Sequence, residues 1–409
     1  MKLLFITQYF PPESEIGGIR ISEIAGYLTK QGHEITVLTG FPNYPSGHIF
    51  PQYKPYKLFF TERNNGINVI RTLLYPSHSK NSFKRFLNYF SFAATSSFRG
   101  LLLSKPDVVI ATSPPLTVGF PAHLVSTFNN VPLVIEIRDL WPEALIELGF
   151  LRNSIAIKSS FLFERFLYND AHKIVTLSKG IKDDIISRGI SSKKCVVLPN
   201  GVNLLLFKEG TQNKELMELK QKGYFIGIYL GSLGTYHGLD LAVQFFLKLK
   251  KLEKVKIVIV GGGAERFKVE KAIRNHNLKN VMLLPLPSRE RMSEFISSAD
   301  FSLVFLKKSK FSRWLVSSKI FMYMACGKPI IGAAAGETRE IIEEANAGII
   351  IDPEKEKIDE LVNIVSKLMC DALLCRKLGV NGRRFVEENF SWKTLARGYE
   401  TILLNIRKK

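Results

Sequence analysis

One sequence pattern occurs twice in this chain, and it limits the folds that the chain can adopt. Each copy has a short apolar run, then glycines, then a segment whose apolar residues recur at helical spacing. The first copy spans 2–28 and carries Gly17 and Gly18, and the second spans 225–249 and carries Gly231 and Gly234. An unbroken apolar run suits a strand buried on both faces, and the i, i+3, i+4, i+7 spacing suits a helix packed on it. The repetition therefore predicts two nucleotide-fold domains.

The same strand and helix alternation continues through both halves of the chain. Apolar, strand-like runs occur at 34–38, 68–71, 108–111, 133–137, 174–177 and 195–198, and again at 225–230, 256–260, 281–284, 301–305, 329–332 and 348–351. Helical patterns separate most of them, so the expected class is α/β with parallel sheets. The polar, lysine-rich stretch from Pro199-Asn200-Gly201 to Lys222 is interpreted as the linker between the domains.

The glycines that follow the two apolar runs have two interpretations. A glycine loop that leads into a helix offers unpaired N–H groups and the positive end of the helix dipole to an anion such as a phosphate. Glycines that only form tight turns would produce the same pattern. Because the loop occurs twice, the sequence favours two anion-binding edges that face one cleft between the domains.

The net charge of +20 indicates an anionic partner. Between Lys57 and Lys105 eight basic residues face only one acidic residue, Glu62. This stretch contains an aromatic helical stripe with basic neighbours, and such a helix is typical of proteins that rest on an anionic membrane surface. The residues assigned to this membrane and acceptor surface are Lys80, Phe83, Lys84, Arg85, Phe86 and Phe90. The alternative is a core helix with solvated charges. No nucleic-acid partner is expected, because the basic residues follow no known binding module.

Several features bear on the cellular compartment. The run at 1–10 is interrupted by Thr7 and Gln8, which argues against a signal peptide, and no uninterrupted apolar stretch of about 18 residues suggests a membrane-spanning helix. The cysteines lack metal-binding spacing and are interpreted as core thiols in a reducing compartment: Cys195, Cys326, Cys370 and Cys375. The expected location is cytoplasmic, peripherally associated with the inner face of the cytoplasmic membrane.

Seven segments give the chain a family resemblance over nearly its whole length. They read GGIRISEIAGYLTKQGHEITVLTGFPNYPSG, TSPPLTVG, VIEIRDLWPE, VTLSKGIKDDI, VVLPNGVN, YLGSLGTYHGLD and SSKIFMYMACGKPII. In this order and spacing they resemble GT-B glycosyltransferases of family 4. RDLWPE and GFPNYPSG resemble the bacterial O-antigen and capsule branch that includes L-fucosamine (N-acetylfucosaminyl) transferases. The resemblance implies two Rossmann-like domains: 1–203 binding the acceptor and 204–390 binding the nucleotide sugar, with a helix at 391–409 packing back on the first.

The resemblance also implies a donor site. Gly17 and Gly18 resemble the segment that lets backbone approach the donor diphosphate and the acceptor, because glycine has no Cβ. Gly231, Ser232 and Gly234 resemble the second loop, and Asn200 lies in a segment that resembles the hinge near the nucleotide. No DxD motif stands out. The resemblance therefore implies no cofactor and no metal, so that the protein itself supplies positive charge to the leaving group.

Two departures concern charge near the diphosphate and the acceptor. The family often has Arg and Lys where this chain has Ser232 and His237, and Arg138 and Lys319 are the candidates to compensate. The family's His-Asp pair aligns with Arg138 and Asp139. Asp139 is the candidate to orient or deprotonate the acceptor hydroxyl, whereas Arg138 stays protonated and cannot be a base. Alternatively, these two residues form an ion pair that braces the loop.

A third departure concerns the donor ribose. The wider family has two glutamates eight positions apart, and here Trp314 and Met322 occupy those positions. Neither side chain accepts hydrogen bonds as a carboxylate does. Either Ser318, Tyr323 or backbone reads the ribose, in which case the donor site comprises these residues with Lys319 and Met322, or the donor site is impaired.

The expected function is a retaining, metal-independent transfer of a sugar, with N-acetyl-L-fucosamine as the expected one, from a UDP-sugar to a polyprenyl-diphosphate-linked saccharide. No carboxylate is identifiable as a covalent nucleophile, which favours front-face displacement. Two alternatives remain open: a non-hydrolysing UDP-sugar 2-epimerase, which needs no lipid acceptor, and a catalytically degenerate binding subunit of a transferase complex.

Overall fold

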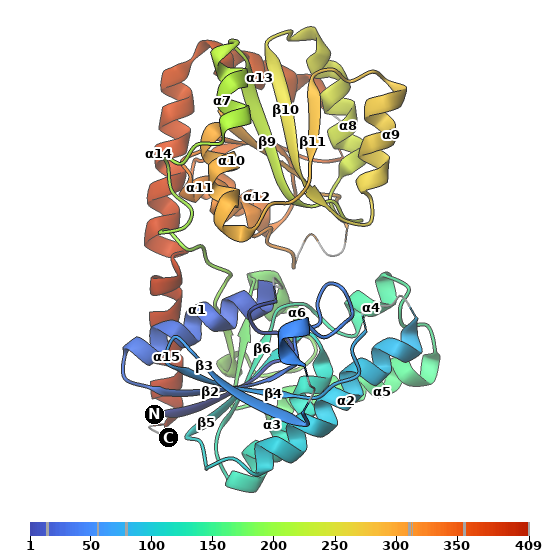
Figure 1. The fold of residues 1–409 in the computed structure, drawn as a ribbon, viewed down its shortest axis with the longest axis vertical. Helices are drawn as coiled ribbons and strands as arrows, with labels where there is room; N and C mark the ends of the chain where they lie inside the picture. Colours follow the sequence, from blue (N-terminus) through green and yellow to red (C-terminus); the bar gives the residue numbers. More distant parts are fainter. Residues whose placement is uncertain are drawn as a thin grey trace. The chain divides into compact units, whose positions relative to one another are not determined.

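Two compact units make up the chain in the computed structural model (Figure 1). The structure describes residues 1–13, 16–54, 57–77, 81–309, 312, 314–354 and 357–407. Unit 1 contains Met1–Pro199 and Trp392–Lys409, and unit 2 contains Asn200–Ser391. Within the described residues no helix is long and apolar enough to cross a membrane.

Unit 1 is built on an eight-stranded sheet with the order β3-β4-β2-β1-β5-β6-β7-β8. Its strands are β1 (Lys2–Ile6), β2 (Glu34–Gly40), β3 (Phe59–Asn64), β4 (Ile67–Thr72), β5 (Val108–Ser113), β6 (Leu133–Ile137), β7 (Lys173–Thr176) and β8 (Cys195–Val197). Its α-helices are α1 (Ile16–Lys30), α2 (Ser82–Leu101), α3 (Gly119–Asn129), α4 (Glu143–Glu147), α5 (Ser154–Asp170), α6 (Lys179–Ser187) and α15 (Trp392–Arg407). Short 3-10 turns lie at Pro51–Tyr53, Leu116–Val118 and Ser192–Lys194.

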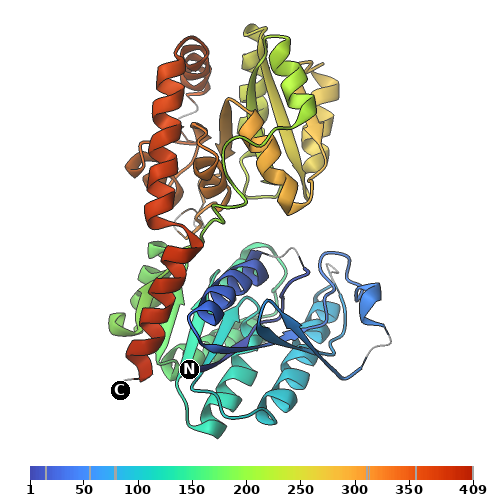
Figure 2. The same ribbon diagram turned by 60° about the vertical axis from the view of Figure 1, so that its left-hand side comes forward.

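The helices of unit 1 cover the two faces of this sheet. On one face α1 and α15 contact each other, and their apolar residues join those of the central strands in one buried cluster (Figure 2). The four residues of the predicted α1 stripe are buried, namely Ile21, Ile24, Ala25 and Leu28. The paired helices α2 and α3 pack against β2, β4 and β5. The alternation read from the sequence therefore gives a layered domain.

β3 was not predicted, and it runs antiparallel to β4. The other strand pairs of the sheet are parallel. Asn65 and Gly66 have positive φ angles of 49° and 83°, which is the backbone conformation of a two-residue hairpin turn. The expectation of purely parallel sheets is therefore wrong at this edge.

Unit 2 is built on a six-stranded parallel sheet with the order β11-β10-β9-β12-β13-β14. The strands are β9 (Phe225–Ser232), β10 (Val255–Gly262), β11 (Val281–Leu284), β12 (Phe301–Phe305), β13 (Ile330–Ala333) and β14 (Gly348–Ile351). The α-helices are α7 (Lys214–Gln221), α8 (Leu239–Lys248), α9 (Arg266–Asn275), α10 (Met292–Ser298), α11 (Lys319–Ala325), α12 (Glu337–Glu344), α13 (Ile358–Cys370) and α14 (Ala372–Asn389), with 3-10 turns at Leu249–Lys251 and Arg289–Arg291. Separate buried clusters lie under α8 and α13 and under α11 and α14.

Three local expectations were wrong. Gly17 and Gly18 lie inside the first turn of α1 rather than in a loop before it. The lysine-rich stretch taken as linker contains α7, because Asn213 caps this helix and Leu216 is buried in the unit 2 core. Cys370 is exposed at the end of α13 and is not a core thiol.

Candidate functional site

A buried lysine lies beneath the end of β9 in unit 2. Lys319 begins α11, and its Nζ lies 3.8 Å from the centroid of the Tyr229 ring. Among the described residues this Nζ has no hydrogen-bond partner. Gly231 has a φ of +119° and passes so close that a Cβ there would lie 3.7 Å from Cε of Lys319. Because a buried cation without a partner is costly, the arrangement is suited to an anion at the Gly231 turn.

The electrostatics of this turn depend on Lys319 and His237. Burial lowers the pKa of Lys319 to about 7. Burial and the neighbouring Lys319 charge lower the pKa of His237 to about 3. The neutral His237 ring accepts a hydrogen bond at Nδ1 from the Gly234 N–H, at 3.3 Å, which holds the loop. Lys319 is thus the group that would take up a proton when an anion binds, whereas the neutral His237 ring holds the backbone of the loop.

The residues around the missing glutamates have different surroundings. Met322 is half-buried and packs against the core beneath the sheet. Tyr323 is fully buried, and its hydroxyl accepts from Leu230 N at 2.8 Å and donates to Leu230 O at 3.4 Å. Tyr323 therefore positions the end of β9 rather than offering its hydroxyl to a ligand. Ser318 and Trp314 are half-buried, and Ser232 is exposed.

In unit 1 the structure brings Arg138 onto the first turn of α1. The guanidinium occupies the space that a side chain at Gly17 would need. Arg138 Nη2 donates to Pro114 O at 3.0 Å, and Arg138 N donates to Ser113 O at 2.9 Å. A Cβ at Gly18 would lie 2.9 Å from the Tyr9 carbonyl oxygen. Gly18 is therefore required sterically by backbone, whereas a side chain at Gly17 would have to displace the Arg138 guanidinium.

Asp139 is exposed and Asn200 is half-buried, and each follows a buried segment. Asp139 follows β6 and is exposed, so its carboxylate is accessible beside Arg138. Asn200 is the residue at which the chain enters unit 2. The position of Asn200 agrees with a hinge, and its proximity to a nucleotide stays a prediction.

A buried ion pair under this turn was not predicted. Arg20 of α1 and Glu136 of β6 are both fully buried, with Nε and Oε2 2.9 Å apart. Arg20 also donates to the carbonyl oxygens of Leu198 and Pro199, and its guanidinium lies 5.9 Å from the Trp392 ring centroid. Arg20 thus ties α1 to both segments at which the chain leaves and re-enters unit 1. In the sequence, the signal that could have indicated this ion pair was an arginine beside the apolar stripe of α1.

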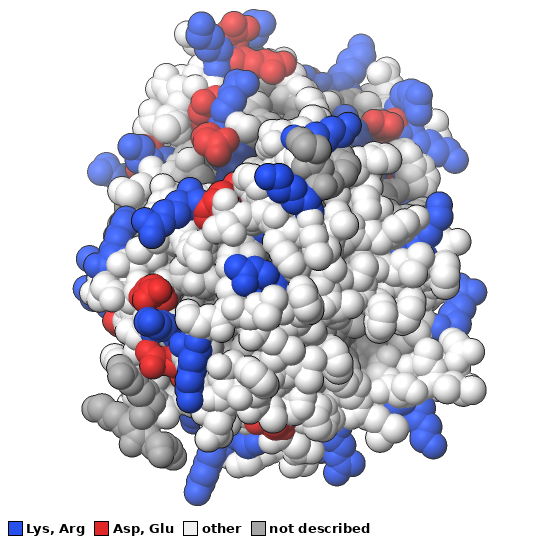
Figure 3. Space-filling view, turned by 60° about the horizontal axis from the view of Figure 1, so that its bottom comes forward, with Lys and Arg blue, Asp and Glu red and all other residues white. Residues whose placement is uncertain are grey.

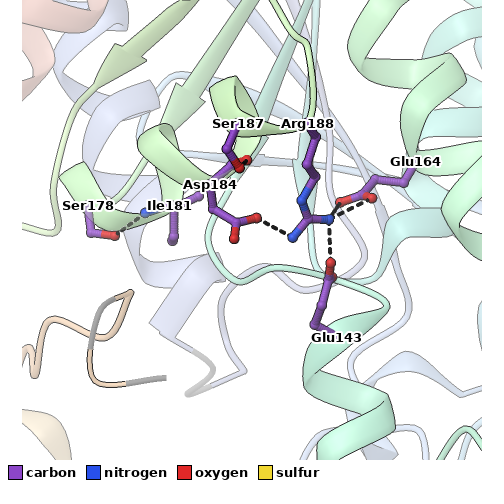
Figure 4. A network of polar contacts seen from close by, with 7 residues as sticks. All are labelled: Glu143, Glu164, Ser178, Ile181, Asp184, Ser187 and Arg188. Atoms are coloured by element: carbon purple, nitrogen blue, oxygen red, sulfur yellow. Dashed lines mark hydrogen bonds and ion pairs between the residues drawn. The ribbon is translucent and has the colours of Figure 1, made fainter. Parts of the chain in front are cut away.

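A second unpredicted network lies around Arg188, which follows α6 (Figure 4). Its guanidinium contacts Glu143 of α4, Glu164 of α5 and Asp184 of α6. Burial, and then the Glu143 charge, raise the pKa of Glu164 to about 7, and burial raises the pKa of Glu143. Because Glu143 ends the RDLWPE segment, the network fixes one end of the loop that carries Arg138 and Asp139.

The aromatic side of α2 faces outward. Phe83, Phe86 and Phe90 are 67%, 57% and 58% exposed. Lys84 is exposed, and the Arg85 guanidinium lies 4.2 Å from the Phe150 ring centroid. Lys80 lies outside the described residues. The opposite side of α2 is buried against the sheet, and the contact of its exposed side with a membrane stays a prediction.

The neighbouring helices extend this apolar surface. Phe128 of α3 and Ile155, Leu162 and Phe166 of α5 are exposed by 72%, 75%, 62% and 47%. Figure 3 looks obliquely onto the end of unit 1 that carries α2 and α3, and shows a broad uncharged area with scattered Lys and Arg and few acidic groups.

Comparison with known families identifies the two units. Residues 17–201 match the glycosyl transferase 4-like domain, and residues 212–385 match the glycosyl transferases group 1. The chain is a glycosyltransferase. Its two Rossmann-like units form the predicted GT-B fold.

Full-length relatives of this glycosyltransferase are distant. It is 24% identical to the colanic acid biosynthesis glycosyl transferase WcaI of Escherichia coli, over 98% of each chain. It is 21% identical to N-acetyl-alpha-D-glucosaminyl L-malate synthase of Bacillus anthracis, over 95% of this chain and 93% of that protein.

Solved structures share its fold. The sucrose-phosphate synthase of Thermosynechococcus elongatus superposes with a TM-score of 0.73 at 16% identity, covering 99% of both chains. Anabaena HepE, solved with UDP, superposes with a TM-score of 0.72 at 17% identity over 99% of this chain and 100% of HepE. In the part of the glycosyltransferase that the structure describes, no group of three or more His, Cys, Asp or Glu residues could hold a metal ion.

Proposed function

We propose that this glycosyltransferase moves a sugar from a UDP-sugar to a polyprenyl-diphosphate-linked saccharide. The transfer is proposed to retain the anomeric configuration and to need no metal. The observation that carries the proposal is the buried Lys319 Nζ beneath the Gly231 turn. A diphosphate at this turn would pair with the lysine. The UDP complex of HepE, a protein of the same fold, supports a uridine nucleotide as the ligand.

The proposed chemistry follows from the groups available. The acceptor oxygen bonds to the anomeric carbon on the face from which the diphosphate departs, and the C–O bond to the diphosphate breaks. The acceptor proton passes to a departing phosphate oxygen, while the exposed Asp139 orients the hydroxyl. Lys319 stabilises the negative charge that develops on the diphosphate. N-acetyl-L-fucosamine is the proposed sugar, on the sequence resemblance described above.

The ribose is proposed to be read by backbone and by Ser318. Met322 packs against the core, and Tyr323 is engaged with Leu230, so neither offers a free acceptor. Losing the glutamate pair removes charge-assisted hydrogen bonds and so weakens donor binding without abolishing it. A degenerate binding subunit would instead leave the burial of Lys319 unexplained.

The acceptor is proposed to reach unit 1 from the membrane, and the exposed aromatic and basic residues of α2 are the proposed contact surface. Their chemistry fits an anionic leaflet, and the acceptor class fits a relative in colanic acid synthesis. The protein would then work at the inner face of the cytoplasmic membrane.

The test is calorimetric titration of the whole protein with UDP and with GDP. We expect UDP to bind and Lys319→Met to lower its affinity by about tenfold or more. Lys328→Met is the matched control, because Lys328 is a half-buried lysine just before β13, at the amino edge of the same sheet. Binding of neither nucleotide by the unmodified protein would overturn the proposal, and preference for GDP would replace the donor.

A further inference from the structure

We propose that an apolar groove beside α2 binds the prenyl chain of the lipid-linked acceptor. This inference rests on the proposed function and adds a subsite to it. The groove has a volume of about 360 Å³. Residues 73–76 and Ile49 form one side of it, and Ser91 and Thr95 of α2 form the other.

The polar groups in the wall of the groove are already paired. Tyr75 N donates to Ser91 Oγ at 2.8 Å, and Thr95 Oγ1 donates to Leu73 O at 2.8 Å. Asn88 Nδ2 donates to the Tyr75 carbonyl oxygen at 2.7 Å. Because the hydroxyls and the amide of α2 satisfy this backbone, the groove offers hydrocarbon to a ligand. An apolar chain would lose little hydrogen bonding by entering it.

The groove lies where substrates of such folds bind. Leu73 directly follows the carboxyl end of β4 at Thr72, and Ile49 belongs to the segment that follows β2. In open α/β sheets ligands bind outside the carboxyl ends of the strands. The acceptor must place its saccharide at this edge of the sheet, whereas the proposed reaction does not require a phospholipid acyl chain there. The location therefore favours the chain of the acceptor itself.

The groove and the exposed aromatic residues lie on neighbouring sides of α2. Ser91 follows Phe90 and is therefore turned about 100° from it around the helix axis. On the groove side, Phe98 is 56% exposed and stacks on Phe59 with ring centroids 6.1 Å apart. The prenyl chain is therefore proposed to pass from the membrane around α2 into the groove.

The charge around the groove complements an acceptor diphosphate. Lys84 precedes Ser91 by seven residues and shares its side of α2, because seven residues make about two helical turns. Arg99 lies on the same helix beside Phe59. The sequence from 57 to 105 contains one acidic residue, Glu62, which pairs with Arg71. An apolar groove with nearby cations matches a hydrocarbon chain that ends in an anion.

The experiment compares three phosphate esters in vesicle-free solution: farnesyl phosphate, dodecyl phosphate and glycerol phosphate. We expect the whole protein to bind farnesyl phosphate at least about tenfold more tightly than glycerol phosphate, because burying a few methylene groups supplies that difference. Ser91→Trp fills the groove and should remove the gain. Leu73→Gln makes the groove polar and should also remove the gain. It keeps the backbone hydrogen bonds of the wall, so it tests the groove even if the tryptophan disturbs folding. Phe267→Ser, at an equally exposed ring in unit 2, should retain it.

Three results would overturn the groove proposal. They are equal affinity for farnesyl and glycerol phosphate, a gain retained in Leu73→Gln, and dodecyl phosphate bound as tightly as farnesyl phosphate. The last would make the groove a general alkyl site. Titrating the same preparations with UDP separates the two proposals. UDP binding without a prenyl gain overturns the groove alone, and a prenyl gain without UDP binding overturns the donor assignment alone.

Discussion

The Arg138 guanidinium lies against the Cα of Gly17, in the space that any side chain at position 17 would fill. Arg138 is held there by the carbonyl oxygen of Pro114. The two residues come from different strand–helix connections of unit 1. Their contact couples the first turn of α1 to the segment that carries Asp139.

The contact between Gly17 and Arg138 can be tested by a double-mutant cycle. Gly17→Ala should displace the guanidinium and lower sugar transfer by about tenfold or more, because a misplaced group near reacting atoms is costly. In an Arg138→Ala background the same change should cost much less, since the two residues share one contact. Transfer rates and thermal unfolding of all four proteins give the coupling. Additive losses would contradict a shared role.

The protonation of Lys319 should make donor binding depend on pH. The pKa of about 7 in the free protein means that the lysine is charged below pH 7 and must take up a proton to pair with a diphosphate above it. UDP affinity should therefore fall from pH 7 to pH 9, by up to about tenfold per unit. Calorimetry in buffers of different ionisation enthalpy would detect the proton uptake. A flat profile, matching that of Lys319→Met, would contradict it.

The same lysine should destabilise the ligand-free protein. The pKa of Lys319 is lower in the folded state than in the unfolded chain, so the unfolded chain binds more protons between about pH 7 and 10.5. The contribution of this site to the free energy of unfolding therefore rises with pH over that window. At pH 7 Lys319→Met should accordingly raise the free energy of unfolding by a few kcal/mol. Chemical denaturation at pH 7 and pH 10 measures it. Lys328→Met should show a smaller effect, because Lys328 is less buried.

The carboxylates around Arg188 predict the opposite dependence on pH. Burial raises the pKa of Glu164 from 4.5 to about 7, so its contribution to stability is present below pH 4.5 and is lost as pH rises through 7. The free energy of unfolding of Glu164→Gln should therefore rise relative to that of the unmodified protein, by up to about 3 kcal/mol, as the pH is raised from 5 to 8. Urea denaturation at both values tests this. Glu147→Gln is the control, because Glu147 is exposed in α4.

The aromatic side of α2 predicts membrane binding that depends on anionic lipid. Phe86→Ser with Phe90→Ser should reduce partition into vesicles containing phosphatidylserine by about tenfold or more, because two exposed rings no longer enter the interface. Phe267→Ser in unit 2 is a control of similar exposure. Vesicle sedimentation measures the partition. Unaltered binding of the double variant, or equal binding to neutral vesicles, would argue against this surface.

Local patterns were most reliable in the buried strands. The predicted strands at 133–137, 281–284, 301–305 and 348–351 have the bounds of β6, β11, β12 and β14. These runs are apolar on both faces, so their pattern does not depend on a neighbour. β3 was missed because it is an edge strand with polar positions, and its only clear signal is the Asn65-Gly66 turn.

The sequence by itself determined the fold class and the family. Repeated apolar runs and helical stripes are local properties, and they specify which faces must be buried. Only the tertiary structure decided which side chains meet: Lys319 beneath Gly231, Arg138 on Gly17, and Arg188 among three carboxylates. Burial sets the pKa values of Lys319 and Glu164, and burial depends on segments that are far apart along the chain.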